Sequence, residues 1–321
     1  MTGPRVTVLG AGLVGACCAW SLAGAGAAVR VIDPGAGRAA ASWAAAGILS
    51  PSHPELLPDA LHDLGDRSLE LWGDLAARHP AVELRRTGQV LLGDEPAWLA
   101  WRERRGRPTR AITWGGEPAH CFPEVGVVRA HRAAPALLAD AGVEAERAPA
   151  PPLDALRAGC DVVVIATGAW AAPHLAEAGL SLQVSPRRGQ MMLFAAGDLP
   201  AVLIEGGREG VAVPRADGRV VAGTTLEDAG FDASTVDADL DRLEGWARER
   251  IPGLGPREDA WAGFRPWSPR PAPTIGWVAP GVIAAVGHFR NGVLLGPATG
   301  EMVAGLVTGR APRVDPAPFA P

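Results

Sequence analysis

Short apolar runs alternate with longer amphipathic stretches along this chain of 321 residues. The apolar runs contain many β-branched residues and are typical of strands buried on both faces of a parallel sheet. Strands are predicted at 6–9, 29–33, 88–92, 162–166, 189–194 and 282–286, with a hairpin over 210–223. Helices are predicted at 13–22, 56–78 and 237–250, and a last helix is expected to open at Pro297. This pattern predicts an α/β chain.

The elements predict two domains that are each assembled from separate segments. A doubly wound, Rossmann-like α/β domain is predicted from residues 1–50, 126–182 and 263–321. A second α+β domain with a mixed sheet is predicted from residues 51–125 and 183–262. The stretch 147–159 is rich in Pro and Ala and connects these elements without a predicted structure of its own.

The first predicted strand leads into a G-x-G-x-x-G motif formed by Gly10, Gly12 and Gly15. In a βαβ unit the first glycine permits the tight turn, the second lets a pyrophosphate reach the backbone, and the third lets helix and strand pack. Asp33 ends the second predicted strand, close to the position where an acidic side chain binds a ribose hydroxyl. The motif in this context predicts a dinucleotide site.

A membrane span is the alternative for the first segment, because no charged residue occurs between Val6 and Val29. The five glycines of this stretch, its β-branched start and the acid that follows fit a buried βαβ unit better. We therefore predict no membrane association.

Composition narrows the class of protein further. A net charge of −5 and a pI near 5.8 predict no nucleic-acid partner. The cysteines Cys17, Cys18, Cys121 and Cys160 lack metal-ligand spacing, so no metal site is predicted. A reduced, cytoplasmic setting without a signal peptide is expected. Cys17 and Cys18 are adjacent on a predicted helix, so at most one is expected to face the core. A homo-oligomer is left open.

A second glycine-bracketed loop, 287–292, joins the last predicted strand to the last predicted helix. The end of such a strand is where α/β folds bind cofactors. Gly287 and Gly292 let backbone N–H groups approach a ligand closely, and a helix N-terminus adds partial positive charge that suits an electron-rich ring.

The run 44–48 consists mostly of small side chains, Ala-Ala-Ala-Gly-Ile. A flat ring system pressed against the backbone needs side chains no larger than methyl groups on the approaching face. The alternative is an Ala-rich helix that packs on the sheet.

The chain resembles the FAD-dependent glycine oxidases of the D-amino-acid oxidase family over nearly its whole length. The stretches that carry the resemblance are 10–15, 42–49 (SWAAAGIL), 188–190 (RGQ), 263–266 (GFRP) and 288–295 (HFRNGVLL). The resemblance implies FAD bound non-covalently, since no cysteine or histidine matches an attachment site. Its implied cofactor-binding residues are Gly10, Gly12, Leu13, Val14, Gly15, Asp33, Pro34, Ala41, Ser42, Ala46, Gly47, Ile48, Ala150, Thr167, Gly168, His288, Phe289, Arg290, Asn291, Gly292, Val293 and Leu294.

Two arginines are the candidate substrate-binding and catalytic residues. Arg265 lies in an apolar, Trp-rich stretch, where a substrate carboxylate can take both forks of the guanidinium. The resemblance implies this role for Arg265 and places Arg290 beside flavin and substrate. The alternatives are an ion pair of Arg265 with a protein acid and a loop-stabilising role for Arg290. His288 is expected to contribute backbone contacts, because hydride transfer to a flavin demands no protein base.

The implied reaction oxidises glycine or another small amino acid or amine. Hydride passes from Cα to the flavin N5, O2 accepts the electrons, and the products are an imino acid, hydrolysed to 2-oxo acid and ammonia, and hydrogen peroxide. Glycine oxidases of the family commonly serve thiamine biosynthesis.

The sequence departs from the family at the substrate site, since it contains no tyrosine. The family binds the carboxylate with a second donor, a tyrosine hydroxyl, where this chain has Val211, and Leu226 stands at an apolar wall of the pocket. One hydrogen bond to a charged group contributes about 1.5–3 kcal/mol, so glycine is expected to bind about ten- to hundredfold more weakly. A flavin oxidase or dehydrogenase of a different, secondary or more apolar amine stays open. A flavin-binding protein with little catalysis also stays open, and an NAD-dependent dehydrogenase fits the small-residue run and the C-terminal loop less well.

Overall fold

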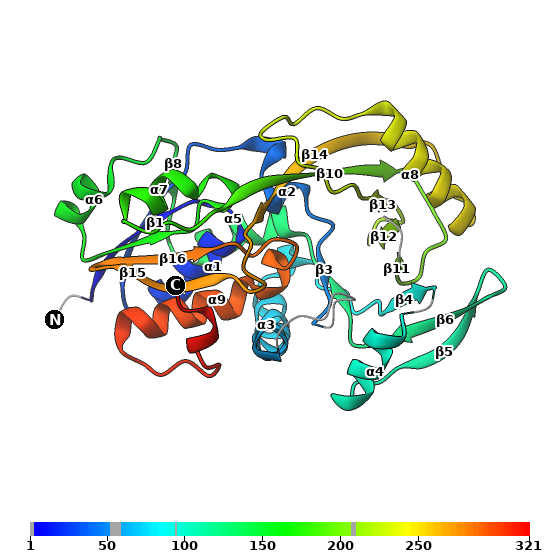
Figure 1. The fold of residues 1–321 in the computed structure, drawn as a ribbon, viewed down its shortest axis with the longest axis horizontal. Helices are drawn as coiled ribbons and strands as arrows, with labels where there is room; N and C mark the ends of the chain where they lie inside the picture. The colour runs from blue at the N-terminus through cyan, green and yellow to red at the C-terminus, as the bar shows by residue number, and fades with distance from the viewer. Residues whose placement is uncertain (1–2, 52–58, 94, 207–209) are drawn as a thin grey trace.

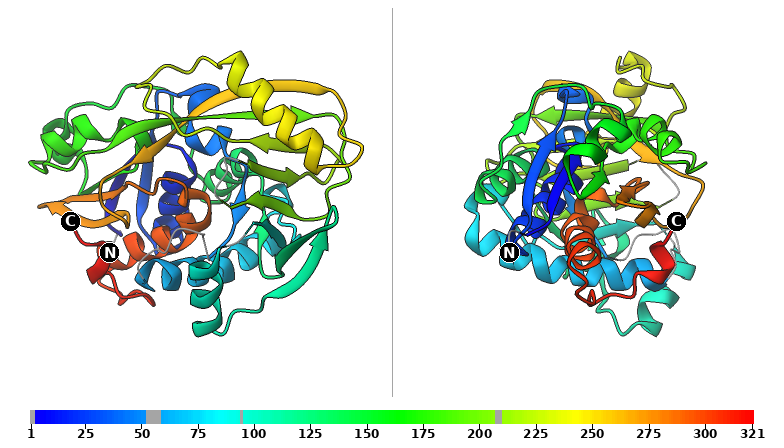
Figure 2. Two further views of the ribbon diagram at one scale, coloured as in Figure 1. Left: turned by 45° about the vertical axis from the view of Figure 1, so that its right-hand side comes forward. Right: turned by 90° about the vertical axis from the view of Figure 1, so that its left-hand side faces the viewer.

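The computed structural model describes residues 3–51, 59–93, 95–206 and 210–321 (Figure 1). Within these residues the chain forms two large sheets that lie side by side, with helices packed on their outer faces (Figures 1 and 2). The first sheet consists, in spatial order, of β15 (Thr274–Ala279), β16 (Val282–Val286), β9 (Val162–Ile165), β1 (Arg5–Leu9), β2 (Ala28–Ile32) and β8 (Ala145–Glu146).

The first sheet is parallel from β16 to β8, and β15 pairs antiparallel at one edge. Val8 of the central strand β1 lies between Val31 and Val164. All four residues of β9 and all five of β16 are buried, as expected for strands covered on both faces. This confirms the doubly wound α/β domain that the apolar runs predict.

Helices cover both faces of this sheet. On one face α1 (Leu13–Gly24) and α9 (Gly292–Thr308) lie on the strands, while α3 (Asp59–Arg78) packs against α9 and α5 (Ala130–Asp140) packs against α1. The other face packs against α6 (Leu153–Gly159) and α7 (Ala172–Glu177). The helix predicted over 56–78 is α3, and residues 56–58 lie outside the described part of the chain. The stretch 147–159 contains α6, which the sequence did not predict.

Helix α1 is buried on more than one side, so the expectation that only one of its two cysteines faces the core was wrong. Cys17 and Cys18 are both buried. The reason is that α9 lies beside α1 on the same face of the sheet and packs tightly against it. Gly296 and Gly300 make this close crossing possible, because a Cβ at Gly300 would overlap the backbone of Cys17.

Helix α9 begins at Gly292, so the prediction that Pro297 opens it was wrong. Pro297 lies inside the helix, where it has no N–H to donate to the carbonyl of Val293. The indole N–H of Trp72 on α3 donates to that carbonyl oxygen instead, at 3.0 Å. The backbone N–H of Ala298 donates to the Ser68 hydroxyl oxygen, also on α3, at 3.0 Å. Buried side chains of α3 thus supply hydrogen bonds to backbone groups of α9 on both sides of Pro297.

The second sheet is mixed. In spatial order it consists of β14 (Arg257–Trp267), β10 (Ser185–Phe194), β13 (Val220–Gly223), β12 (Gly210–Pro214), β11 (Val202–Glu205), β4 (Gln89–Leu92), β6 (Glu117–Phe122) and β5 (Arg110–Trp114). One face packs against α8 (Asp237–Arg250), and the other against α4 (Pro96–Arg104) and the residues around β3 (Ile48–Leu49). The predicted hairpin is β12 and β13, and the helix predicted over 237–250 is α8.

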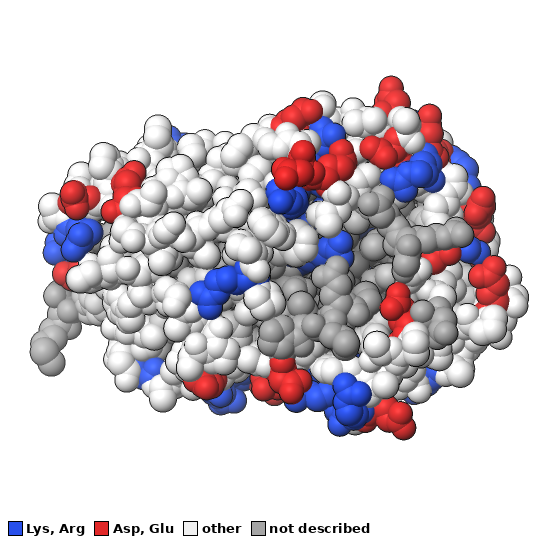
Figure 3. All heavy atoms as spheres, in the orientation of Figure 1, with Lys and Arg blue, Asp and Glu red and all other residues white. Residues whose placement is uncertain are grey.

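The remaining elements are short. They are α2 (Ala41–Ala44), β7 (Gly126–Val127), which pairs with β3, and the 3-10 turns η1 (Gly37–Ala39), η2 (Pro80–Val82), η3 (Gly168–Trp170) and η4 (Ala317–Phe319). Strand β14 runs across the predicted domain boundary at 262/263, and the division into domains stays a prediction. Among the described residues, no helix combines the length and the apolarity that a membrane span requires. In the view of Figure 3 acidic and basic side chains are interspersed, mostly over the half that carries the second sheet.

Candidate active site

A cavity of about 1300 Å³ lies where residues of both sheets meet. Pockets for a single small ligand usually measure about 300–1,000 Å³, so this cavity has room for a dinucleotide and a small substrate. Every residue that the sequence assigns to cofactor or substrate lines the cavity, except Gly15. Gly15 packs against the preceding turn, because a Cβ there would overlap the carbonyl oxygen of Gly10. This is the packing role that the third glycine of the motif predicts.

The glycine loop after β1 is held by two side chains from neighbouring segments. Asp33 accepts hydrogen bonds from the backbone N–H of Ala11 at 2.6 Å and of Gly35 at 2.5 Å. The Ser42 hydroxyl oxygen accepts from the backbone N–H of Leu13 at 2.8 Å, at the start of α1. Gly10 adopts φ 102°, which a residue with a side chain rarely does. Asp33 and Ser42 therefore fix the loop at the cavity wall.

The small-residue run is only partly helical. Helix α2 ends at Ala44, Ala45 is extended, and Gly47 has φ 86°. A Cβ at Gly47 would overlap the carbonyl oxygen of Val128, so this position requires glycine. Ala46, Gly47 and Ile48 lie outside the short helix and line the cavity. The alternative of a continuous Ala-rich helix is therefore wrong for these three residues.

Buried polar atoms at the cavity fit a polar ligand such as FAD. Within the described part of the chain, neither Oγ1 of Thr167 nor Nδ1 of His174 has a hydrogen-bond partner, and both residues line the cavity. Buried polar groups are almost always paired, so such atoms point to a ligand or water. The hydroxyls and phosphates of a dinucleotide offer such partners, and the glycine loop offers the backbone approach that a pyrophosphate needs.

The loop between β16 and α9 carries the second glycine-bracketed segment. Phe289 has φ 47°, and its N–H donates to the carbonyl oxygen of Pro266 at 3.1 Å. His288 is buried and its Nε2 lies 3.0 Å from Oγ1 of Thr299. Burial lowers the pKa of His288 to about 4, so the ring is neutral at physiological pH. These contacts agree with the structural role expected for His288.

The N-terminus of α9 lies at the cavity, since Gly292, Val293 and Leu294 line it. Because α9 begins at Gly292 instead of Pro297, its partial positive charge is closer to the loop than the sequence predicts. Arg290 is exposed, lines the cavity and lies 5.5 Å over the ring of Phe289.

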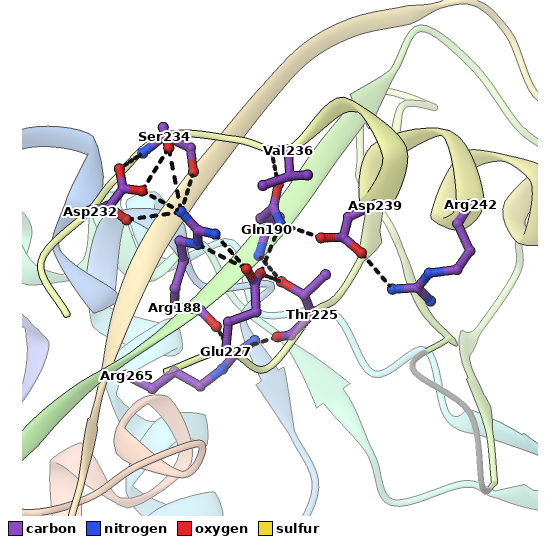
Figure 4. Close-up of polar contacts among 10 residues, drawn as sticks. All are labelled: Arg188, Gln190, Thr225, Glu227, Asp232, Ser234, Val236, Asp239, Arg242 and Arg265. Atoms are coloured by element: carbon purple, nitrogen blue, oxygen red, sulfur yellow. Dashed lines mark hydrogen bonds and ion pairs between the residues drawn. The ribbon is translucent and has the colours of Figure 1, made fainter. Parts of the chain in front are cut away.

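Arg265 extends from β14 into the cavity and is held by oxygen atoms of Arg188 on β10 and of the two threonines that follow β13 (Figure 4). Its Nη1 donates to the carbonyl oxygen of Thr225 at 3.0 Å and, more weakly, of Arg188 at 3.4 Å. Its Nη2 donates to the Thr224 hydroxyl oxygen at 2.7 Å. These three acceptors are neutral oxygen atoms, and they orient the guanidinium. A carboxylate in the cavity is the complementary ligand.

Behind Arg265 lies a charged network centred on Glu227 (Figure 4). Glu227 accepts from Nη2 of Arg188 at 2.5 Å, from Nε2 of Gln190 at 2.8 Å and from the Thr225 hydroxyl. Burial raises the pKa of Glu227, but these hydrogen bonds outweigh it and hold the pKa below its ordinary value. Arg188 also pairs with Asp232 at 2.9 Å. The network therefore fixes the segment that supplies the acceptors of Arg265.

Val211 and Leu226 both line the cavity. Val211 and Val213 pack on one face of β12, with Ala46 and Ile48, while Ala212 packs on the opposite face. This confirms the alternation expected for β12 and puts Val211 on the cavity side. Leu226 is 40% exposed, so it forms the rim of the cavity.

The sequence missed several residues of this site. Thr224 and Thr225 follow β13 and orient Arg265, and Gln89, Met191 and Ile204 line the cavity from neighbouring strands. A Thr-Thr pair after a strand has no distinctive pattern. The one signal in the sequence was Gln89, a polar residue at the start of an apolar run. Among the described residues, no cluster of His, Cys, Asp and Glu could hold a metal ion.

A Rossmann-like sheet with a dinucleotide loop, joined at one large cavity to a second mixed sheet, defines a cofactor-dependent oxidoreductase. The chain belongs to the family of FAD-dependent oxidoreductases (DAO), whose family profile matches residues 5–306. It is similar to the glycine oxidase of Pseudomonas aeruginosa, with 33% identity over 99% of this chain and 98% of the relative. It is also similar to the hydrogen cyanide synthase subunit HcnC of the same species, with 30% identity over 98% of this chain and 94% of that protein. The crystal structure of glycine oxidase from Geobacillus kaustophilus matches with a TM-score of 0.86 and 27% identity, covering 99% of this chain and 98% of that one.

Proposed function

We propose that this FAD-dependent oxidoreductase carries out the oxidative deamination of glycine or another small amino acid. The observation that carries the proposal is the position of Arg265, whose guanidinium extends into the cavity with Nη1 and Nη2 oriented by neutral oxygen atoms. A cation held in this way suits a ligand carboxylate, and a bidentate pair fixes the direction of the substrate as well as its position.

The chain's own residues perform binding, orientation and shielding. Arg265 would hold the carboxylate, and Arg290, at the same cavity, would lie on the other side of the substrate. Ala46, Gly47 and Ile48 would present a flat wall to the isoalloxazine. The N-terminus of α9 would stabilise negative charge beside it. His288, buried and bonded to Thr299, would stay neutral and move no proton.

When bound, FAD supplies a hydride acceptor, N5, and passes the electrons on to O2, so that the products are imino acid (then 2-oxo acid and ammonia) and hydrogen peroxide. The glycine loop, with Asp33 and Ser42 behind it, would hold the pyrophosphate part without a covalent bond. We further propose a cytoplasmic enzyme whose product serves thiamine biosynthesis.

A second candidate substrate is a secondary or more apolar amine, oxidised with O2 or another acceptor. The observation that favours it is Val211, an apolar side chain on the cavity face of β12. A hydroxyl donor at this position would support a carboxylate, whereas valine leaves volume and an apolar surface. The chain is similar both to a glycine oxidase and to a hydrogen cyanide synthase subunit. The identity of the electron acceptor therefore has to be established by experiment.

The test is to purify the protein, release its cofactor by acid precipitation, and add amines anaerobically. Yellow colour in the supernatant with the mass of FAD is expected. Glycine, D-alanine and sarcosine, and N-methylbutylamine as a secondary apolar amine without a carboxylate, should each be tried for bleaching of the flavin, followed by peroxide detection in air. Bleaching by an amino acid with peroxide release supports the proposal. Bleaching only by amines that lack a carboxylate would favour the second candidate, and bleaching by none would contradict both.

A further inference from the structure

The cavity contains one buried polar side chain that the proposed function leaves unused. Gln89, the first residue of β4, lines the cavity and is fully buried. Within the described ranges of the chain, neither Oε1 nor Nε2 of Gln89 has a hydrogen-bond partner. Buried amides are almost always paired, and a site built around an unpaired amide discriminates strongly for a ligand that pairs with it.

The side chains around Gln89 are apolar. Its neighbours on the adjacent strands are Phe122 and Val202, and both belong to the apolar cluster on the cavity side of the sheet. The same cluster contains Leu91, two residues further along β4, and packs against Ile204 and Val211. Because side chains alternate along a strand, Gln89 points to the same face as Leu91. The amide therefore stands as a polar group in an apolar wall of the cavity.

The position of Gln89 along the sheet sets the size of the ligand that it can contact. Ile204 pairs with Val211 across β11 and β12, and β4 is the next strand beyond β11. Arg265 is hydrogen-bonded to Thr224 and Thr225, which follow β13, and β13 lies three strands from β4. Strands lie about 4.8 Å apart, so roughly 14 Å separates this end of the cavity from β4. The Gln89 side chain covers part of this span. Glycine bound at the Arg265 guanidinium is too short to bridge the rest of the span to Gln89, whereas an amino acid with a tail of several atoms is long enough.

We propose that Gln89 is a specificity-determining residue that binds an uncharged hydrogen-bonding group, a hydroxyl or an amide, in the tail of an amino acid whose carboxylate lies on Arg265. The inference rests on the proposed function and narrows its substrate class. An amide offers one acceptor and two donors, which suits a group that both donates and accepts. The valine at position 211 leaves the path between the two ends of the cavity open for such a tail.

The test compares pairs of substrates that have the same shape but differ in polarity. N-(2-hydroxyethyl)glycine is paired with N-propylglycine, and D-asparagine is paired with D-leucine, so that tails on nitrogen and on Cα are both covered. In the native holoenzyme the ratio of kcat/KM between the polar and the apolar member is expected to be about ten or more in one pair. In Gln89→Met, which keeps the length of the side chain without its amide, that ratio should fall to about one or below. Because the ratio compares kcat/KM of two substrates of the same protein, a general change in activity cancels.

Gln190→Met is the matched control. Gln190 is equally buried, but its amide donates to Glu227 and Asp239 and accepts from the backbone N–H of Val236. Its replacement should change both members of a pair alike and leave the ratio as it is in the native enzyme. Native enzyme that prefers the apolar member of both pairs would overturn the inference without any variant. A Gln89→Met protein that keeps the native ratio would also overturn it, and loss of FAD with an unchanged ratio would assign the amide to the cofactor.

The same pairs separate this inference from the proposed function. Thermal shifts of the flavin-loaded protein give the affinity of each compound without turnover. If no compound bleaches the flavin but the polar members bind more tightly in native protein than in Gln89→Met, the inference stands and the proposed oxidation fails. If glycine bleaches the flavin while the affinities within each pair are equal, the oxidation stands and the inference fails.

Discussion

The carbonyl oxygen of Thr225 accepts a hydrogen bond from Nη1 of Arg265 at 3.0 Å, and this contact joins the candidate carboxylate anchor to the segment after β13. The next residue but one, Glu227, is paired with Arg188 and Gln190. The orientation of Arg265 therefore depends on a backbone segment that charged side chains hold in place. A guanidinium that is oriented before the substrate arrives loses less entropy on binding, which is the physical basis for the first two predictions.

Replacing Arg265 with Lys should raise KM for amino acids about ten- to hundredfold and leave FAD content intact. A lysine keeps the charge but cannot form the bidentate pair with a carboxylate. Arg265→Ala should raise KM further, because a carboxylate buried without a partner costs more than a weakened contact. Steady-state kinetics of flavin-loaded variants measure both effects, and an unchanged KM in either variant would remove Arg265 from the substrate site.

Replacing Glu227 with Gln should raise KM about tenfold with a smaller change in kcat. Gln keeps the shape of Glu227 but removes one of the two carboxylate charges that pair with Arg188, whose side chain is only 7% exposed. The acceptors on Thr224 and Thr225 then shift and Arg265 loses its fixed orientation. The control is Asp241→Asn on α8, whose side chain is 73% exposed and faces Arg257 at 3.9 Å. A lower Tm for Glu227→Gln with an unchanged KM would leave this residue a structural role only.

The parts of the fold that the sequence predicts well are those whose local pattern has one solution. Continuous apolar runs predict β9 and β16, and the spacing of glycines and Asp33 predicts the loop after β1. The predicted start of α9 at Pro297 was wrong because a proline usually marks the first turn of a helix. Here Trp72 and Ser68 on a distant helix satisfy the groups that Pro297 leaves unpaired. No local pattern carries that compensation.

The residues of the site also divide into those that local sequence predicts and those that only the fold brings together. The candidate residues in the two glycine loops and in the small-residue run follow from local motifs or from the resemblance, and all but Gly15 line one cavity. Thr224, Thr225 and Gln89 enter the site only because β4, β11, β12, β13 and β10 lie side by side, and pairing of distant strands cannot be read from local sequence. Position along the chain also could not show that both Cys17 and Cys18 are buried, since this depends on α9 covering α1.

The neutral, buried His288 should make the protein less stable as the pH falls. Its pKa is about 4 in the folded protein and near 6.5 when exposed, so the unfolded chain binds more protons between these values. The contribution is complete above about pH 6.5 and is lost progressively toward pH 4, with a size of about 3 kcal/mol. Urea unfolding across this range measures it. His288→Gln should flatten the difference, and an equal pH dependence in both proteins would contradict the assignment of His288.

Ser68→Ala should lower the free energy of unfolding by about 1–3 kcal/mol, because it leaves the buried N–H of Ala298 without its acceptor. Trp72→Phe removes the donor to the carbonyl of Val293 and should act in the same direction. Both changes loosen the first turns of α9, so FAD should also dissociate more readily. Denaturant unfolding and fluorescence of released FAD are the measurements. Native-like unfolding and FAD release in Ser68→Ala would show that α9 does not need this hydrogen bond.

Val211→Tyr should tighten glycine binding by a factor of a few to about a hundred, the range of one charge-assisted hydrogen bond. Val211 packs on the cavity side of β12, so a tyrosine there would carry its hydroxyl toward the space in front of Arg265. The same ring would fill the volume that valine leaves open, and bulkier amino acids should therefore bind more weakly.

The matched control is Val211→Phe, which adds the same ring without the hydroxyl and should penalise bulky substrates without helping glycine. Ala212→Tyr is a second control, because Ala212 is fully buried on the opposite face and a large side chain there would disturb packing alone. KM values for glycine and D-leucine in the three variants separate the two effects of the ring and its hydroxyl. Equal glycine affinity in Val211→Tyr and Val211→Phe would mean that the carboxylate does not lie near position 211, and the larger amine would then become the favoured substrate.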